Sequence, residues 1–270
     1  MTAPTQLDAM LTVAGANGRV DVAEGWGQGR ATFGGIIGGL LLARAEAVVA
    51  DAERPLRSAT VSFVAPVEPG PAELDGVVLR AGRAVTQVQV SLRQADAVAA
   101  VMLASFGCAR ESRFDLTAAD AAVPGAPAPG AVERSPHYPG FTPDFLAHVD
   151  LRLTDGGLPF TGAAEPDFTG WMRFAEPPAA FTLPHLMTLT DCWAPSMLPM
   201  LDEIRPASTL AWTFEPVGDP PPGGDDPAAH WLYRVHTDRC ANGYGHAQAR
   251  VWDAGGRLRV ISRQTTTVFA

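Results

Sequence analysis

The order of elements that the sequence predicts repeats once along the chain, and this repeat limits the fold more than any single motif. The first copy is predicted to hold one helix and four strands, over 36–50, 59–64, 74–80, 85–92 and 98–106. The second copy is predicted to hold the same set, over 184–194, 208–217, 231–237, 245–252 and 258–269. A shift of 150 positions lays 58–67 on 208–217, and Ser, Pro and Val match in the two stretches. The sequence therefore predicts a tandem duplication of a helix followed by an antiparallel meander.

The first helix is predicted from apolar residues that recur at three- and four-residue spacing. These residues are Leu40, Ala43, Ala47 and Ala50. Thr32 is a suitable N-cap for this segment. The glycines that open it are poor helix formers, so we expect them to allow close approach of another backbone or of a ligand.

Composition divides the chain into two lobes and a linker. Residues 118–143 are rich in Ala, Pro and Gly and show no apolar periodicity, which is typical of a linker. We therefore predict a first lobe over 1–117 and a second lobe over 144–270. Residues 1–30 are predicted to form short strands and turns, and 218–226 to form a loop inserted in the second copy.

The overall composition is that of a globular protein, with 47% hydrophobic and 18% charged residues. The net charge of −9 argues against a nucleic-acid partner and against an anionic membrane surface. No stretch approaches the roughly 20 apolar residues of a membrane span, and no secretory signal is visible, so we expect a cytoplasmic location. The three cysteines are far apart and are expected to be reduced thiols: Cys108, Cys192 and Cys240.

Asp191 is a lone carboxylate in the second predicted helix, with no basic residue within four positions. Such a carboxylate is either solvated on the outer face or half-buried and held by polar partners, because burying an unpaired charge is costly. The 150-residue shift sets Leu41 opposite Asp191 and Ala59 opposite Thr209, so the first copy lacks this polar pair. A purely structural Asp191 would not need that asymmetry, which favours a functional role.

The stretch Gly29-Arg30-Ala31-Thr32-Phe33-Gly34-Gly35 resembles a known helix opening, the G-R-x-F-G-G motif of the acyl-CoA thioesterase II family. This sequence has one residue more between Arg30 and Phe33, and Ile36 replaces the polar residue often found after the two glycines. The resemblance extends over nearly the whole chain outside the linker and the 218–226 loop. It implies an α+β fold, a tandem double hot-dog with two long helices, each wrapped by an antiparallel sheet, and the sheets joined across the lobes.

The resemblance also implies a catalytic set of an Asp on the second helix, a Thr or Ser on the next strand and a Gln on the last strand. Asp191, Thr209 and Gln264 match these positions in order. A carboxylate can act as general base on a water, while a hydroxyl and an amide orient that water toward a thioester carbonyl. The chain is thus expected to hydrolyse a coenzyme A thioester without a covalent intermediate, and this chemistry requires no metal or organic cofactor.

Gly34 and Gly35 are predicted to bind substrate, because backbone N–H groups near a helix start can stabilise an oxyanion. Arg263 is predicted to contact the phosphates of coenzyme A, with ordinary strand-surface charge as the alternative. It belongs to a C-terminal cluster with Arg250, Arg257 and Arg259. The first lobe is predicted to be catalytically silent, so each chain carries one site that needs both lobes. A homo-oligomer, a dimer of double hot-dogs, is compatible with the resemblance.

Two other functions remain open at this point. One is a non-catalytic acyl-CoA or acyl-carrier binding protein. The other is a hot-dog enoyl-CoA hydratase that would use Asp226 and His230, although these residues fall in a Gly- and Pro-rich loop. No Gly-x-Ser-x-Gly is present to form a nucleophile elbow. Cys192 is expected to be a buried, inert thiol, and His185 to have a capping or surface role.

Overall fold

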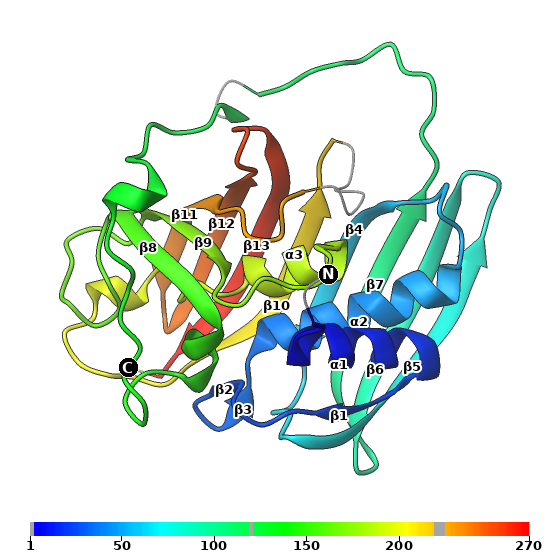
Figure 1. Cartoon of the computed structure of the whole chain (residues 1–270), viewed down its shortest axis with the longest axis horizontal. Helices are drawn as coiled ribbons and strands as arrows, with labels where there is room; N and C mark the ends of the chain where they lie inside the picture. Colours follow the sequence, from blue (N-terminus) through cyan, green and yellow to red (C-terminus); the bar gives the residue numbers. More distant parts are fainter. Residues whose placement is uncertain (1–2, 119–120, 219–224, 270) are drawn as a thin grey trace.

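The computed structural model describes residues 3–118, 121–218 and 225–269. Within these ranges, eleven strands form one antiparallel sheet that carries both copies of the duplication (Figure 1). The strand order is β1-β5-β6-β7-β4-β10-β13-β12-β11-β9-β8, so the first copy occupies one half of the sheet and the second copy the other half. The predicted α+β architecture, with the two sheets joined across the lobes, is confirmed.

The elements of the first half are α1 (Gln6–Asn17), β1 (Arg19–Val22), β2 (Gly27–Gln28), β3 (Ala31–Thr32), α2 (Gly34–Val49), β4 (Leu56–Phe63), β5 (Gly70–Ala81), β6 (Val85–Gln94) and β7 (Ala97–Gly107). The second half contains η3 (Asp144–His148), β8 (Val149–Asp155), β9 (Phe168–Phe174), α3 (Leu183–Thr190), η4 (Leu198–Met200), β10 (Ala207–Pro216), β11 (Trp231–Ala241), β12 (Tyr244–Trp252) and β13 (Leu258–Val268). A further short helix, η2 (Pro129–Ala131), lies between the halves. The repeated strands and α2 were predicted with bounds close to these, whereas α3, with 8 residues, is shorter than the helix predicted over 184–194.

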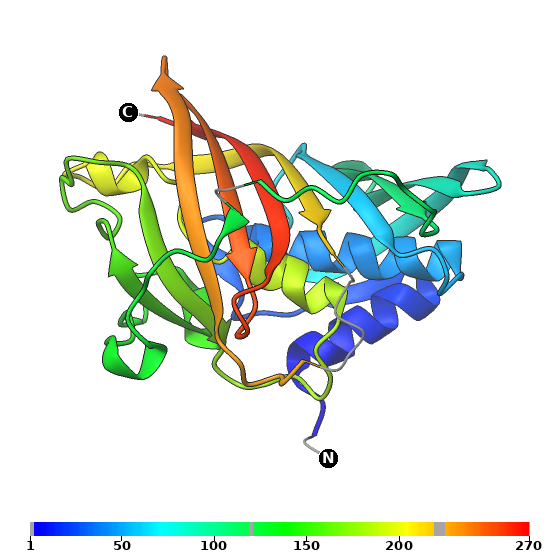
Figure 2. The ribbon, with the colours of Figure 1, turned by 90° about the horizontal axis from the view of Figure 1, so that it is seen from above.

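The two halves join where β4 pairs with β10 in antiparallel register, with Val61 opposite Trp212 and Thr60 opposite Thr213. This pairing removes a strand edge from each half, and an unpaired edge would invite association with other chains. The α-helices lie on one side of the sheet (Figure 2). A large apolar core runs between the helices and the sheet across both halves, and a smaller cluster of Met197, Leu198 and Val268 lies apart from it.

Helices α2 and α3 pack against each other at glycine positions. A Cβ atom added at Gly35 would overlap the carbonyl oxygen of Thr188, and one added at Gly39 would overlap the Thr188 hydroxyl. These two glycines are four residues apart, so they lie on the same face of α2. Their missing side chains let the helices of the two halves approach closely, which confirms the expectation of close approach near the start of the first helix.

The N-terminal segment differs from the prediction, because α1 forms where only short strands and turns were expected. Thr5 caps this helix in a reciprocal pair: the Asp8 N–H donates to the Thr5 hydroxyl at 3.2 Å, and the Thr5 N–H donates to the Asp8 carboxylate at 2.7 Å. Gly18 ends the helix in the left-handed conformation, with φ of 64°. Of the short strands expected within 1–30, β1 (Arg19–Val22) and β2 (Gly27–Gln28) are present.

The described part of the predicted linker lies along the second half of the sheet. The indole N–H of Trp171 donates to the carbonyl of Pro127 at 2.8 Å, and the indole N–H of Trp252 donates to that of Ala121 at 2.8 Å. Residues 119–120 of the linker, and 219–224 of the predicted loop, lie outside the described residues. No helix in the described ranges is long and apolar enough to cross a membrane.

Candidate active site

Asp191 lies at the end of α3 rather than inside it, because the helix ends at Thr190. The prediction of a helix through 194 was therefore wrong at its C-terminal end. A longer helix would need the residue at position 195 to donate its N–H to the Asp191 carbonyl, and Pro195 has no N–H. Asp191 is the C-cap residue, with φ of −89° and ψ of 0°.

The Asp191 carboxylate is held by groups from both halves of the chain. The side-chain amide of Gln264, on β13, donates to Asp191 Oδ1 at 2.6 Å. The backbone N–H of Gly35, in the first turn of α2, also donates to the carboxylate. A Cβ atom at Gly34 would lie 2.8 Å from Asp191 Oδ2, so only glycine leaves room for the carboxylate there.

The start of α2 is capped differently from the prediction. Phe33, not Thr32, is the N-cap residue, and it makes no side-chain capping bond. The Thr32 hydroxyl is buried without a hydrogen-bond partner among the described residues. Asp191 from the other half of the chain instead accepts the Gly35 N–H, and the positive end of the helix dipole favours an anion at that point.

Burial governs the protonation of this carboxylate. Asp191 as a residue is half-buried, but desolvation of its carboxylate raises its pKa to about 7. The hydrogen bonds from Gln264 and from the Gly35 backbone oppose this rise and lower the pKa only in part. A base whose pKa lies near neutrality suits proton transfer at physiological pH.

Thr209 lies on the same face of the sheet as Gln264. It pairs with Thr266 across β10 and β13, and Thr266 is two positions from Gln264. A β-bulge between Thr209 and Ala211 inserts one extra residue on β10 next to this point. Within the described ranges the Thr209 hydroxyl makes no hydrogen bond to Asp191 or Gln264. The structure thus brings Asp191 and Gln264 into contact and sets Thr209 beside them on one face.

Arg263 is not brought to these residues. It directly precedes Gln264 on β13, so its side chain points to the opposite face of the sheet. There it is exposed and donates to Asp238 at 2.6 Å and to Gln248 at 2.9 Å. In the same C-terminal cluster, Arg257 and Arg259 both contact the buried carboxylate of Asp253.

Family models match both halves of the chain. A model of the acyl-CoA thioesterase N-terminal domain matches residues 22–107, and a model of the C-terminal domain matches residues 119–268. The chain belongs to the acyl-CoA thioesterase family. It is a thioester hydrolase, as the resemblance at the start of the first helix implied. No curated protein matches it.

Several solved structures have the same fold as this thioesterase. A hot-dog protein of unknown function from Alicyclobacillus acidocaldarius has a TM-score of 0.81 at 23% identity, over 96% of this chain and 98% of that one. A protein assigned as a thioesterase II from Thermobifida fusca has a TM-score of 0.81 at 24% identity, with both chains fully covered. The acyl-CoA thioesterase II TesB2 of Mycobacterium marinum has a TM-score of 0.70 at 18% identity, over 93% and 91% of the two chains.

Sequence analysis missed one neighbour of Asp191 in this thioesterase, an aromatic cluster of Phe168, Trp193 and Tyr233. The three ring centroids lie 5.4 to 6.2 Å apart. Burial, and to a smaller extent the nearby carboxylate of Asp191, raises the pKa of Tyr233 and keeps its phenol neutral. The alternation of Trp231, Tyr233 and Val235 along β11 indicates an inward face, but no sequence signal places that face beside Asp191.

Cys192 and His185 have the structural roles expected of them. The Cys192 thiol is buried and lies 3.7 Å from the sulfur of Met172, and desolvation raises its pKa well above the ordinary value. His185 is buried rather than exposed: its Nδ1 bonds the Thr182 hydroxyl at 2.7 Å, and its Nε2 lies 3.1 Å from Asp8. His185 therefore completes the capping of α3 and ties it to the N-terminal helix.

Proposed function

We propose that the chain hydrolyses acyl-CoA thioesters to free acid and coenzyme A at one site, with Asp191 as general base. The observation that carries this proposal is a pair of hydrogen bonds to the Asp191 carboxylate. One comes from the Gln264 side-chain amide of the second half, and the other from the Gly35 backbone N–H of the first half. A desolvated carboxylate that is held in place and has a pKa near 7 is suited to take a proton from water.

In the proposed reaction, Asp191 accepts a proton from a water whose oxygen attacks the thioester carbonyl carbon. Gln264 uses its amide N–H on Asp191, which leaves its amide oxygen free to accept a hydrogen bond from that water. The Thr209 hydroxyl, which has no hydrogen-bond partner among the described residues, is a second group that can orient the water. Collapse of the tetrahedral oxyanion breaks the C–S bond, and the departing thiolate takes the proton from Asp191 to give free coenzyme A.

The first half supplies structure to this site but no second set of catalytic groups. The positions that the 150-residue shift sets opposite Asp191 and Thr209 are Leu41 and Ala59, and both are fully buried apolar residues. We therefore propose that the lobe over 1–117 is catalytically silent and that the lobe over 144–270 carries the base. The start of α2 nevertheless holds Asp191, so the proposed site requires both lobes.

Gly34 remains the proposed substrate-facing glycine, because only a missing side chain leaves room beside the Asp191 carboxylate. The Gly35 N–H donates to Asp191, so it supports the base and is not the oxyanion donor expected from the sequence. The sequence also predicted Arg263 as a substrate-binding residue. Its place on the outer face, bonded to Asp238 and Gln248, gives this role no support.

Release of free thiol from a panel of acyl-CoAs separates hydrolysis from passive binding. We expect turnover of at least one acyl class by the full chain, with equal amounts of free acid and coenzyme A. Tight binding of every acyl-CoA without thiol release would favour the alternative, a non-catalytic acyl-CoA or acyl-carrier binding protein. Hydration of an enoyl-CoA without thiol release would favour the hydratase alternative.

A further inference from the structure

An aromatic ring packs against the start of α2, where the Gly35 N–H donates to Asp191. A Cβ atom at Gly35 would lie 2.5 and 2.6 Å from two carbons of the Phe33 ring, so the edge of this ring fills the space beside Gly35. The Phe33 N–H donates to the carbonyl of Trp26 at 2.8 Å, and the Phe33 side chain is fully buried. Phe33 thus joins the Gly35 backbone to the segment that forms β2 and β3.

The Phe33 ring is covered by Phe145 of η3, the short helix at the start of the second half. The two ring centroids lie 4.1 Å apart, and the ring planes are 6° apart. Phe145 is 4% exposed, so the stacked pair is closed to solvent. Loss of one ring would leave a space against the face of the other, into which that ring can shift.

Further contacts dock η3 on the same segment of the first half. The His148 ring stacks on the Trp26 ring with centroids 3.9 Å apart, and His148 Nε2 lies 3.0 Å from the carbonyl oxygen of Gly25. A Cβ atom at Gly27 would lie 3.0 Å from Asp144 Oδ2. The helix therefore contacts the first half with residues from its first position to its last.

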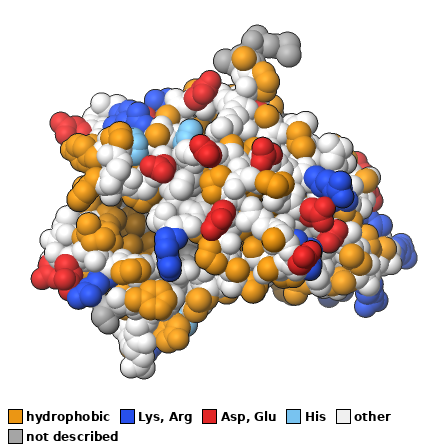
Figure 3. Space-filling model, turned by 90° about the horizontal axis from the view of Figure 1, so that it is seen from below, with side chains coloured by type: hydrophobic (Ala, Val, Ile, Leu, Met, Phe, Trp, Pro, Cys, Tyr) orange, Lys and Arg blue, Asp and Glu red, His pale blue; other side chains and the backbone are white. Residues whose placement is uncertain are grey.

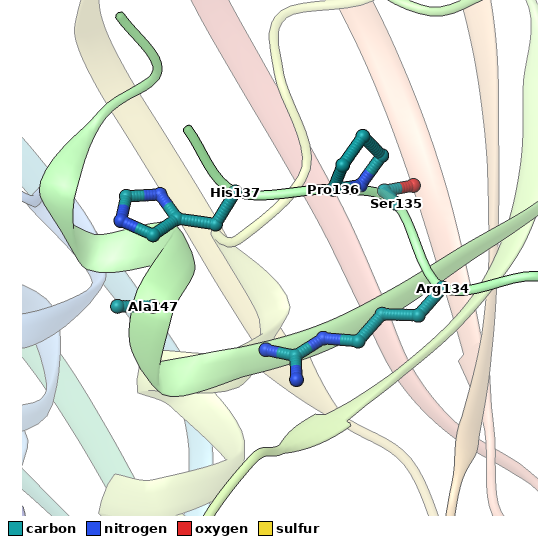
Figure 4. Close-up of a pocket in the computed structure, with 5 residues that line it drawn as sticks. All are labelled: Arg134, Ser135, Pro136, His137 and Ala147. Atoms are coloured by element: carbon teal, nitrogen blue, oxygen red, sulfur yellow. The ribbon is translucent and has the colours of Figure 1, made fainter. Parts of the chain in front are cut away.

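The end of the predicted linker packs behind η3. Figure 4 shows Ala147 of this helix beside the segment 134–137, and together they line a surface hollow of about 400 Å³. The segment is fixed to the sheet, because the Ser135 N–H donates to the carbonyl of Leu151 at 2.7 Å. With three residues per turn, Ala147 and Phe145 point to different sides of η3. The linker end thus supports the helix from a side that Phe145 does not use.

The charges around Asp191 leave this contact as the route by which Phe145 can act. Among the described residues, Cys192 and Tyr233 interact electrostatically with Asp191, and both stay neutral because burial raises their pKa values. The groups that α2 and β13 present to Asp191, a backbone N–H and a side-chain amide, are uncharged. On the face drawn in Figure 3, acidic and basic side chains are mixed. Exchange of Phe145 for another apolar residue changes no charge, so any effect on Asp191 must pass through packing.

We propose that Phe145 is a positioning residue for Asp191: it holds Phe33 against Gly35, and Phe33 keeps the Gly35 N–H directed at the Asp191 carboxylate. The proposal rests on the role proposed above for Asp191 as general base, and it adds a residue outside the G-R-x-F-G-G resemblance. That motif contains Phe33 but not the ring that stacks on it.

NMR of the full chain, labelled with ¹³C at Asp carboxyl groups and with ¹⁵N at glycines, tests this role without turnover. The Asp191 signal is the one that Asp191→Asn lacks. In the wild type, the Gly35 amide proton should shift as Asp191 ionises, because it donates to that carboxylate. In Phe145→Leu, which removes the ring and keeps an apolar side chain, this response should largely disappear.

The same variant should change the titration of Asp191 itself. Its pKa, about 7 in the wild type, should rise by about one pH unit, because a hydrogen bond that favours the anion is weakened. At pH 7 the ionised fraction, and kcat/KM with it, should then fall about fivefold. If Phe145→Leu does not fold, Phe145→Met carries the same expectation, since its flexible side chain adapts to the space of the ring.

Phe106→Leu is the matched control, because it makes the same change at a side chain that is 2% exposed. Phe106 pairs with Leu56 at one end of β4, whereas Phe63, at the other end of this strand, lies beside Gly34. We expect Phe106→Leu to lower the free energy of unfolding and to leave both the Asp191 titration and the Gly35 response as in the wild type.

An Asp191 pKa that is unchanged or lower in Phe145→Leu, or an equal change in Phe106→Leu, would overturn the proposal. The positioning role and the hydrolytic role can fail separately, because NMR observes the carboxyl group directly. If the pKa rises as expected while Asp191→Asn hydrolyses acyl-CoA at the wild-type rate, Phe145 positions Asp191 and the proposed general base is wrong.

Discussion

At the scale of single residues, the site depends on the Asp191 carboxylate, whose ionised form is desolvated at an unfavourable free energy. Burial raises the pKa of Asp191 to about 7, against the effect of two hydrogen bonds that favour the anion. A structural carboxylate gains nothing from such a place, because desolvation of a charge opposes folding. A general base gains a pKa matched to neutral solution.

The first prediction concerns the pH dependence of hydrolysis. Since only the ionised Asp191 can accept a proton, kcat/KM should rise with pH through an apparent pKa of about 7 and then level off. Initial rates between pH 5 and 9 with one acyl-CoA would measure this. A profile that is flat across this range, or that rises only near pH 4, would mean that Asp191 titrates as an ordinary carboxylate.

The second prediction concerns how the stability of the fold depends on pH, and it follows from the raised pKa of Asp191. The folded pKa of Asp191 is raised above its unfolded value, so this group stabilises the fold below about pH 4 and loses that contribution as pH rises toward 7. Asp191→Asn should therefore be more stable than the wild type at pH 8, with a smaller difference at pH 4. Urea unfolding at the two pH values checks this. A variant less stable at pH 8 would show that the ionised carboxylate supports the fold.

The third prediction separates the roles of Gln264 and Thr209. Gln264→Ala removes a hydrogen bond to a charged group, about 1.5–3 kcal/mol, so kcat should fall roughly 10–100-fold. Its pH profile should also move upward, because that bond lowers the pKa of Asp191. Thr209→Ala should reduce kcat about tenfold without moving the profile. Thr213→Ala, opposite Arg263 on the outer face, is the control that should change neither.

At the scale of elements, the contact between α2 and α3 places the Gly35 N–H on Asp191. Much of this could be predicted: the apolar spacing of 36–50 indicated α2, and its glycines indicated a close approach. The capping of the start of α2 could not be predicted, because the capping group, the Asp191 carboxylate, comes from the other half of the chain. The end of α3 was predicted too late, although Pro195 carries the reason. The Thr5 and Asp8 capping pair, Gly18 and the helical spacing of Leu7, Met10, Leu11 and Ala14 were all sequence signals for α1 that the prediction of short strands overlooked.

The fourth prediction concerns this helix contact. A Cβ at Gly39 would overlap the Thr188 hydroxyl and lie 3.1 Å from the carbonyl of Pro184, so Gly39→Ala should force α2 and α3 apart. We expect a loss of about 1–3 kcal/mol in the free energy of unfolding, as for other overpacked core positions. Gly130→Ala is the control, because nothing lies within 4 Å of its added Cβ. Equal unfolding midpoints for the two variants would contradict the tight helix contact.

At the scale of the whole molecule, we propose that the duplication builds one working site from two copies. The order of elements made the double hot-dog predictable, and the apolar residues Leu41 and Ala59 are the sequence feature on which the proposed asymmetry rests. The packing of the linker against the second half was not predictable, because a composition rich in Ala, Pro and Gly does not specify tertiary contacts. Trp171 and Trp252 supply those contacts from the sheet.

The fifth prediction follows from this asymmetry. A non-hydrolysable acyl-CoA analogue should titrate to one equivalent per chain. Residues 1–117 and 144–270, expressed separately, should each be insoluble or inactive, because the β4 and β10 edges lose their pairing and Asp191 loses the Gly35 N–H. Two equal binding sites, or an isolated second lobe as active as the full chain, would contradict a shared site.

In the proposed reaction, Asp191 activates the water that cleaves the thioester. The most direct test of this step is the rate of thiol release by Asp191→Asn at saturating acyl-CoA, alongside binding of the non-hydrolysable analogue to the same variant. We expect kcat to fall about 10²–10⁴-fold, as is typical of a lost general base, with analogue binding retained at one equivalent per chain. A kcat within a few fold of the wild type would contradict this role of Asp191.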